Sequence, residues 1–416
     1  MIPRVEFDPN APVPLSGLRV VDMSRLVAGN MVSLQLADQG AEVIKIEDPT
    51  VGDPLRAWRV KGVSLYWKVY ARNKKSLALN LRAPEGKDVL HDLLARSDVL
   101  IENFRPGTLE QMGFGPDVLH MRNPGLIIVR ITGFGQDGPY RDRPGFGTLV
   151  EAMSGFASKN GFEDRPPVLP PLAMADMISG LYGAYAIMVA LRVVERGGKG
   201  QVIDLPLLEP MISVLGPDPA IFWATGEKPR RTGSRSLTTS PRNVYETSDN
   251  RFIAISASIQ AMAERVFRAI GKPEMIDDPR FRTNTDRVRN IDACDAAVGE
   301  FIASRTLARN MAIFEAAEVT ANPVYEIDQL VEDPHVQGRG VLVEAPDDDV
   351  GSVLMHNIIP RLSGTPGRFR LPAPNLGQHS RSVLESIGVE AERIDALAAD
   401  GVIKEAKDPS GINRSI

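Results

Sequence analysis

Residues 17–47 read GLRVVDMSRLVAGNMVSLQLADQGAEVIKIE, and this stretch decides the fold. Its two ends, GLRVVDMS and EVIKIE, are short runs rich in β-branched residues, which is typical of buried strands. Between them MVSLQLADQG predicts a helix that ends at Gly40, because glycine readily adopts the left-handed conformation that closes a helix. The stretch therefore predicts a strand, a helix and a second strand joined by a right-handed crossover.

The same alternation continues to about residue 200. SLALNL is followed by the helical pattern PEGKDVLHDLLARS, which has Pro84 at its start, and then by DVLIEN and LIIVRITGFG. Strands that alternate with helices predict a parallel sheet covered on both faces. We therefore expect an α/β fold with a Rossmann-like open parallel sheet in a large domain.

From about residue 205 the pattern changes. EKPRRTGSRSLTTSPRN is polar and turn-rich, and NVYETSDNRFIAISAS predicts two strands around a turn at Asp249 and Asn250. The Pro-rich PRLSGTPGRFRLPAPNLGQ predicts an extended segment that returns over the first domain. The expected divisions are the first part of the large domain at 1–210, a linker at 211–243, a smaller α+β domain at 244–335, and a linker with the C-terminal return at 336–416.

The composition narrows the class of protein. The chain has 416 residues, of which 43% are hydrophobic and 24% charged, as in ordinary soluble enzymes. A formal net charge of -5 disfavours nucleic-acid binding. Cys294 is the only cysteine and is expected in the core, so no internal disulfide forms and a reducing compartment fits. With no signal-like N-terminus and apolar runs shorter than a bilayer, we expect a cytoplasmic protein that is not inserted in a membrane.

Two familiar kinds of site are not expected. The five histidines are scattered without metal-ligand spacing, so no protein-built metal site is predicted. The segment from Gly133 to Gly138, GFGQDG, matches G-x-G-x-x-G, but Pro139 and Tyr140 follow where a dinucleotide-binding helix would begin. It predicts a tight glycine turn rather than a binding site for NAD or FAD.

Polar residues end the strand DVLIEN. Glu102, Asn103, Phe104 and Arg105 should lie at the carboxyl edge of the sheet, where ligands bind in open α/β folds. An aromatic ring, an amide and a guanidinium suit a nucleotide, although such residues also serve merely to form a turn. The basic run at residues 72–75 is either the wall of a phosphate pocket or a solvated loop.

Asp176 precedes a long apolar helical pattern that ends at Gly197. It should lie at or near the helix N-cap, where the helix dipole and free N–H groups hold a carboxylate ionised. Gly180 and Gly183 follow one and two turns later and should leave room beside that helix end. Because aspartate is a favoured N-cap in any helix, this position alone favours a capping role over catalysis.

Several segments occur together in one order: LSGLRVVDMSRLVAG, LADQGAEVIKIEDPTVGDPLR, RNKKSLALNL, SDVLIENFRPGTLEQMGFG and MADMISGLYGA. Through them the chain resembles the family III coenzyme A transferases from about residue 14 to 403. The resemblance implies transfer of CoA from an acyl-CoA donor to a carboxylic acid by an interlocked homodimer. It implies that Asp176 is the nucleophile, forming a mixed anhydride and then an aspartyl-CoA thioester, without metal or redox cofactor.

The CoA site follows from the resemblance and from the sheet-edge argument together. Its predicted residues are Leu26, Lys74, Lys75, Asn103, Phe104, Arg105 and Met112.

The chain departs from formyl-CoA transferases at several matching positions. Asp48 and Gln111 stand in place of arginines, Val27 stands in place of a glutamine, and FGTLVEA at residues 146–152 replaces F-D-x-x-x-Q-A. We therefore do not expect formyl-CoA or oxalate as substrate. Arg56, Arg141 and Arg143 favour a dicarboxylate such as succinate.

Two other functions share this fold. A racemase of α-methylacyl-CoA would need a histidine and an aspartate where Phe146 and Gly147 stand. A non-catalytic CoA-binding subunit of a heteromeric transferase would be expected to lose the nucleophile, and Asp176 is present.

Overall fold

The computed structural model describes residues 1–406, and the chain forms two compact units. The larger unit contains residues 1–156, 169–217 and 335–406 of the described chain, and the smaller contains 157–168 and 218–334. The smaller unit thus includes residues 157–168, predicted to belong to the large domain, and 218–243, predicted to belong to a linker.

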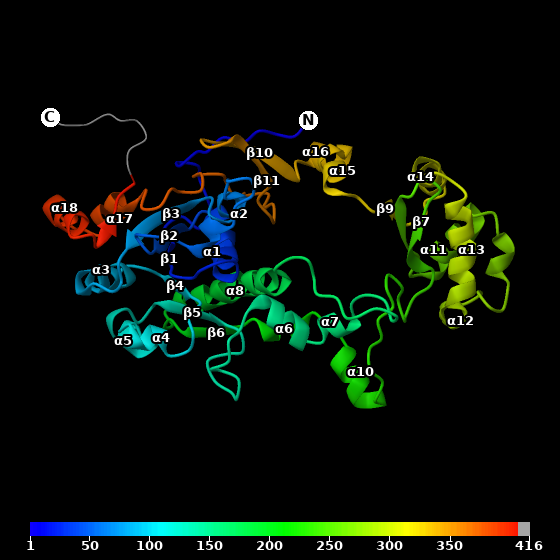
Figure 1. Cartoon of the computed structure of the whole chain (residues 1–416), viewed down its shortest axis with the longest axis horizontal. Coiled ribbons are helices and arrows are strands. Elements are labelled where there is room, and N and C mark those ends of the chain that lie inside the picture. The colour runs from blue at the N-terminus through cyan, green and yellow to red at the C-terminus, as the bar shows by residue number, and fades with distance from the viewer. Residues whose placement is uncertain (407–416) are drawn as a thin grey trace. The chain divides into compact units, whose positions relative to one another are not determined.

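The larger unit is built on a seven-stranded sheet of order β12-β3-β2-β1-β4-β5-β6. Strands β1 to β6 are labelled in Figure 1. The strands are β1 (Arg19–Asp22), β2 (Glu42–Glu47), β3 (Lys74–Leu79), β4 (Val99–Glu102), β5 (Ile127–Thr132), β6 (Val202–Pro206) and β12 (Ile403–Lys404). All pairs are parallel except β12 with β3. The predicted Rossmann-like open sheet is confirmed, and its strand order reverses between β1 and β4.

Helices cover both faces of this sheet. Val20 and Ile101 face α1 (Ala28–Asp38), α6 (Gly147–Met153), α8 (Met174–Val194) and α9 (Leu208–Ser213). Val21 and Leu100, one position along, face α3 (Pro84–Leu94), α4 (Thr108–Gln111), α5 (Pro116–Arg122), α17 (Ser380–Ser386) and α18 (Ala391–Ala399). This alternation explains the nearly continuous apolar strands of the sequence.

Two glycines of α8 lie against α1. A Cβ on Gly180 would lie 2.3 Å from Met31 Cγ, and one on Gly183 would lie 2.7 Å from Val32 Cγ2. The expectation that these glycines leave room beside the helix end is wrong, because they instead allow two helices to pack closely. With 21 residues, α8 is also, among the described residues, the one helix long and apolar enough to cross a membrane, and 33% of its apolar window is buried.

The C-terminal segment returns over the larger unit as predicted. After the hairpin of β10 (Leu342–Asp347) and β11 (Gly351–His356), the backbone N–H of Arg368 donates to the Asp38 carbonyl at 3.1 Å. Trp67 Nε1 of α2 (Leu65–Tyr70) donates to the Pro374 carbonyl at 3.0 Å, and Arg56 Nη2 of η1 (Pro54–Ala57) donates to the same carbonyl at 3.0 Å. This extended segment therefore gives a donor to the Asp38 carbonyl and an acceptor to the buried Trp67 indole.

The smaller unit has a three-stranded antiparallel sheet of β7 (Arg242–Glu246), β8 (Phe252–Ser256) and β9 (Ala321–Pro323). Asn250, with φ of 55°, lies in the predicted β7–β8 turn. Cys294 is fully buried in α13 (Ile291–Ala303), and burial raises the pKa of its thiol to about 11, which confirms a core role. The other helices that lie wholly or mostly in this unit are α7 (Phe156–Lys159), α10 (Asp218–Thr225), α11 (Gln260–Ala269), η2 (Pro273–Ile276), α12 (Asn284–Arg289), α14 (Leu307–Ala316) and α15 (Ile327–Glu332).

Candidate active site

A cavity of 330 Å³ opens at the carboxyl ends of β1, β4 and β5, at the point where the strand order reverses. Its wall consists of Arg25, Leu26, Ala28, Pro54, Asn103, Phe104, Arg105, Pro106, Ile131, Thr132, Gly133, Arg141, Arg143, Pro144, Gly145, Phe146, Asp176 and Leu207. The structure thus brings five predicted site residues into one wall: Leu26, Asn103, Phe104, Arg105 and Asp176.

Asp176 is the third residue of α8, and Ala173 rather than Asp176 is the N-cap. The backbone N–H of Ala28, the first residue of α1, donates a hydrogen bond to the Asp176 carboxylate. A Cβ on Gly147 would lie 2.3 Å from Asp176 Oδ2, so only glycine at this position of α6 fits beside the carboxylate. Asp176 is therefore enclosed by the first turns of three helices.

The environment of Asp176 raises the pKa of its carboxyl above that of an exposed aspartate. Glu151 of α6 is 2% exposed, and its Oε1 accepts the Ala175 N–H at 3.0 Å, so it caps α8 from another helix. Burial, first, and the negative charge of Glu151, second, raise the pKa of Asp176 to about 6. The N–H groups of Ala28 and Asp176 lower this pKa, but burial and Glu151 together outweigh them.

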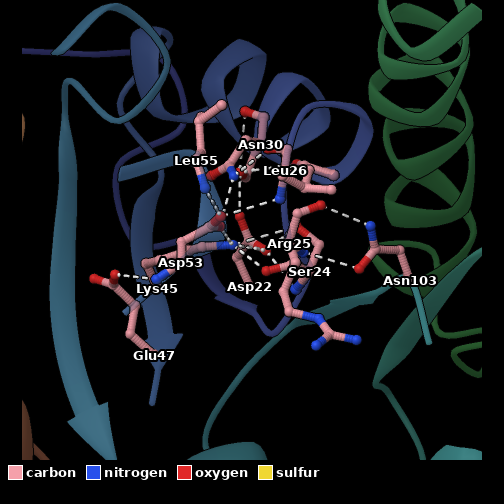
Figure 2. A network of polar contacts seen from close by, with 12 residues as sticks. Asp22, Ser24, Arg25, Leu26, Asn30, Lys45, Glu47, Asp53, Leu55 and Asn103 are labelled. Atoms are coloured by element: carbon pink, nitrogen blue, oxygen red, sulfur yellow. Dashed lines mark hydrogen bonds and ion pairs between the residues drawn. The ribbon is translucent and has the colours of Figure 1, made fainter. Parts of the chain in front are cut away.

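The loop after β1 is tied to the end of β4. Asn103 Oδ1 accepts the Arg25 N–H, and Asn103 Nδ2 donates to the Arg25 carbonyl, both at 2.8 Å (Figure 2). The Arg25 guanidinium lies 5.5 Å from the centre of the Phe104 ring. The amide of Asn103 is therefore committed to the protein backbone, while Phe104 and Arg105 face the cavity.

Three predicted CoA residues lie outside the cavity wall. Lys74 is fully buried, and its Nζ donates to Asn30 O and Oδ1 at 2.9 and 3.0 Å. Lys75 Nζ donates to Glu42 Oε1 at 2.6 Å, and Met112 packs on the core beneath the sheet. The structure gives these side chains structural partners, and their contact with CoA stays a prediction.

Arginines give the cavity its charge. Arg25, Arg105, Arg141 and Arg143 belong to the wall, where Asp176 is the one acidic residue. Arg143 stacks 3.6 Å above the Tyr140 ring. Arg56, the third arginine suggested for a substrate carboxylate, instead binds Glu47 through two hydrogen bonds of 2.7 and 2.8 Å. The cavity therefore suits an anionic ligand, with Arg141 and Arg143 as candidates for a carboxylate.

The glycine-rich segment after β5 shapes one side of the cavity. Gly135 and Gly138 have φ of 102° and 75°, as the predicted tight turn requires. A Cβ on Gly133 would lie 2.5 Å from the Gly145 Cα, so the two ends of the loop touch through their backbones. The next helix begins at Gly147, and the loop rather than a helix follows the G-x-G-x-x-G pattern.

Sequence reasoning missed two carboxylates that organise the site. Glu151 was noticed as a departure from glutamine, but nothing local shows that it caps another helix. Asp53, which is 3% exposed, accepts the Leu26 N–H at 3.0 Å and the Leu55 N–H at 2.8 Å. An aspartate directly before a proline is a usual signal for the start of a helix, so the Asp53-Pro54 pair could have indicated that Asp53 has a capping role.

Comparisons with known proteins agree with this geometry. The family model described as CoA-transferase family III matches residues 15–380. The chain is 38% identical to succinyl-CoA–D-citramalate CoA-transferase of Chloroflexus aurantiacus, covering 94% of this chain and 98% of the relative. It is 36% identical to succinate–glutarate CoA-transferase of Agrobacterium fabrum, with the same two coverages, 94% and 98%. A crystal structure of a CaiB/BaiF family protein from Brucella suis superposes with a TM-score of 0.80 at 32% identity, over 91% of this chain and 100% of that one. The chain therefore belongs to the family III CoA-transferases and is an enzyme of this kind.

Proposed function

We propose that the enzyme transfers coenzyme A from an acyl-CoA donor to a carboxylic acid acceptor with Asp176 as the covalent nucleophile. The observation that carries the proposal is the Asp176 carboxylate in the wall of the cavity, bonded by the N–H of Ala28. A pKa of about 6 leaves most of the carboxylate ionised at pH 7 and makes it more basic than an exposed aspartate. Both properties favour a nucleophile.

The proposed reaction conserves the thioester energy. An Asp176 oxygen attacks the donor carbonyl, the C–S bond breaks, and CoA thiolate leaves a mixed anhydride. The thiolate then attacks the Asp176 carbonyl, which releases the donor acid and forms the aspartyl-CoA thioester. The acceptor carboxylate attacks this thioester, which releases CoA thiolate and leaves a second mixed anhydride. The thiolate then attacks the acceptor carbonyl of this anhydride, which produces the new acyl-CoA and frees the Asp176 carboxylate. No metal or redox cofactor takes part, and water must be kept from both intermediates.

We propose a dicarboxylic acid as one substrate. The citramalate and glutarate transferases that resemble this chain are named for such acids. Arg141 and Arg143 in the cavity wall supply guanidinium groups for the carboxylate that does not react. Phe104 and Arg105 at the end of β4 would then face CoA, and Leu26 would contact it from the opposite loop.

The proposed assembly is an interlocked homodimer in the cytoplasm. The face of α8 turned away from α1 exposes Leu181, Tyr185 and Val189, with Tyr185 at 68%. A row of apolar side chains on one helix is typical of a surface covered by another chain. Light scattering at decreasing concentration should show a dimer throughout, and a monomer would contradict this assembly.

Trapping the intermediate tests the chemistry. Incubation with succinyl-CoA alone followed by hydroxylamine should modify a single peptide, the one that contains residues 172–180. The Asp176→Asn variant should not be modified and should lose transfer by several orders of magnitude, because an amide is a poor nucleophile. Modification of another carboxylate, or an active Asp176→Asn enzyme, would overturn the proposal.

A further inference from the structure

The loop of residues 24–26, between β1 and α1, is held in an unusual way. All six of its backbone N–H and C=O groups bond to side chains (Figure 2). The partners are Asp22 and Lys45 for Ser24, Asn103 for both groups of Arg25, and Asp53 and Asn30 for Leu26. Backbone groups of loops usually form hydrogen bonds with water, whereas side chains of the surrounding core hold the backbone of this loop in place.

Leu26 explains why the loop needs so many bonds. Its φ is 64°, in the left-handed region where the Cβ of a leucine crowds the next carbonyl. Asp53 Oδ1 accepts its N–H at 3.0 Å, and Asn30 Nδ2 donates to its C=O at 2.6 Å. A strained residue of this kind persists only where its surroundings determine it, and such residues cluster at active sites.

Buried charges in turn fix these two partners. Lys45 is fully buried, and its Nζ lies 3.1 Å from Asp53 Oδ2 and 3.1 Å from Asp22 Oδ1. Asn30 Nδ2 also donates to Asp53 Oδ2 at 2.9 Å. Because Lys74 donates to Asn30 Oδ1, the amide nitrogen of Asn30 must face Leu26. Neither Asp53 nor Asn30 can turn away without leaving a buried charge or amide unpaired.

The loop leads directly to the nucleophile. Leu26 and Ala28 both belong to the cavity wall, and the N–H of Ala28 bonds the Asp176 carboxylate. A change of the Leu26 backbone to negative φ would move the first turn of α1 and withdraw that N–H. Resting on the proposed function, we propose that Asp53, together with Asn30 and Lys45, is a positioning residue for CoA transfer, which holds Leu26 in its left-handed conformation and so keeps Ala28 on Asp176.

The pH profile of kcat/KM is the measurement that tests this role. Asp53→Asn should lower kcat about 10- to 100-fold, as small misplacements in active sites do. It should also move the acid-side midpoint to higher pH, because the Ala28 N–H lowers the pKa of Asp176. Glu151 and the wall arginines stay in place in this variant, so the shift reports the lost N–H. Asn30→Ala, which leaves the buried charges balanced, should move the midpoint in the same direction by less.

Asp38→Asn is the matched control. Asp38 is 4% exposed at the other end of α1, where it binds Arg72 at 2.6 Å and Asn73 at 2.8 Å. This variant should melt at a lower temperature with an unmoved midpoint. If Asp53→Asn and Asn30→Ala also only lower the melting temperature, the inference is overturned. Should Asp53→Asn fail to fold, Asn30→Ala decides alone. Hydroxylamine trapping at Asp176 in the parent shows separately whether the proposed chemistry holds.

Discussion

Replacing Glu151 by glutamine should shift the pH dependence of transfer to lower pH. The variant keeps the cap of α8, because the glutamine oxygen can still accept the Ala175 N–H that Glu151 now accepts at 3.0 Å. It removes the negative charge that, after burial, is the second cause of the raised pKa of Asp176. Only the electrostatic role of Glu151 is therefore tested.

The size of the shift is bounded by the structure. The pKa of Asp176 rises from 3.8 to about 6, and burial, the larger cause, remains in the variant. A fall on the order of one pKa unit is expected, which corresponds to about 1.4 kcal/mol. At pH 5 the ionised fraction of Asp176 would rise from about 0.1 to about 0.5, so kcat/KM should increase up to about fivefold. Above pH 7 both enzymes are ionised, and the variant should be no faster.

Initial rates of succinyl-CoA turnover between pH 4.5 and 8 would measure the midpoint, with parent and variant in the same buffers so that substrate titration cancels. Glu42→Gln is the control, because Glu42 is a partly buried carboxylate at the start of β2, bonded to Arg19 and Lys75 rather than near Asp176. An unmoved midpoint in the Glu151→Gln enzyme, or a midpoint moved upward, would refute the electrostatic reasoning.

Three further outcomes follow from the same site. Arg143→Gln should raise KM for a dicarboxylate about 10-fold or more while changing KM for a monocarboxylate of similar length little, as steady-state kinetics with paired acids would show. Asp176→Asn should be more stable than the parent at pH 7 by up to about 3 kcal/mol. The pKa of Asp176 is about 6 in the folded protein and 3.8 in the unfolded chain, so the parent loses stability as pH rises between these values, and the variant does not. Urea unfolding should show that the difference vanishes below about pH 4. Because Phe146 offers no base in the cavity wall, 2-methylacyl-CoA should exchange no α-proton for deuterium by NMR, and Asp176-dependent exchange would revive a racemase.

The parallel sheet was predictable because each strand is a short apolar run that can be recognised from its own residues. Val20, Val21, Val43 and Ile44 lie in β-branched runs, and runs buried on both faces show as continuous apolar sequence. The place of Asn103 and Phe104 at the carboxyl edge followed from that topology alone. The approximate place of Asp176 followed from the helix start.

Properties set by contacts between distant segments could not be predicted in the same way. Lys74 looks like part of a basic surface loop, yet it is fully buried and its pKa falls to about 7 because burial disfavours the charge. The raised pKa of Asp176 depends on Glu151, which lies on a separate helix. Gly180 serves the approach of Met31 from α1, which a reading of α8 alone does not show.

The short strand β12 has a consequence for biosynthesis. It pairs with the outer edge of β3 through Ile403 and Lys404, close to the end of the described chain. Roughly 320 residues must be translated after β3 before this partner exists, which takes about 20 to 60 s at ~5–20 residues per second. Throughout that time the nascent sheet offers an unpaired edge to other chains. A chain released from the ribosome before residue 403 would keep this edge unpaired and would be prone to aggregate, so chaperone demand should depend on the synthesis of Ile403 and Lys404.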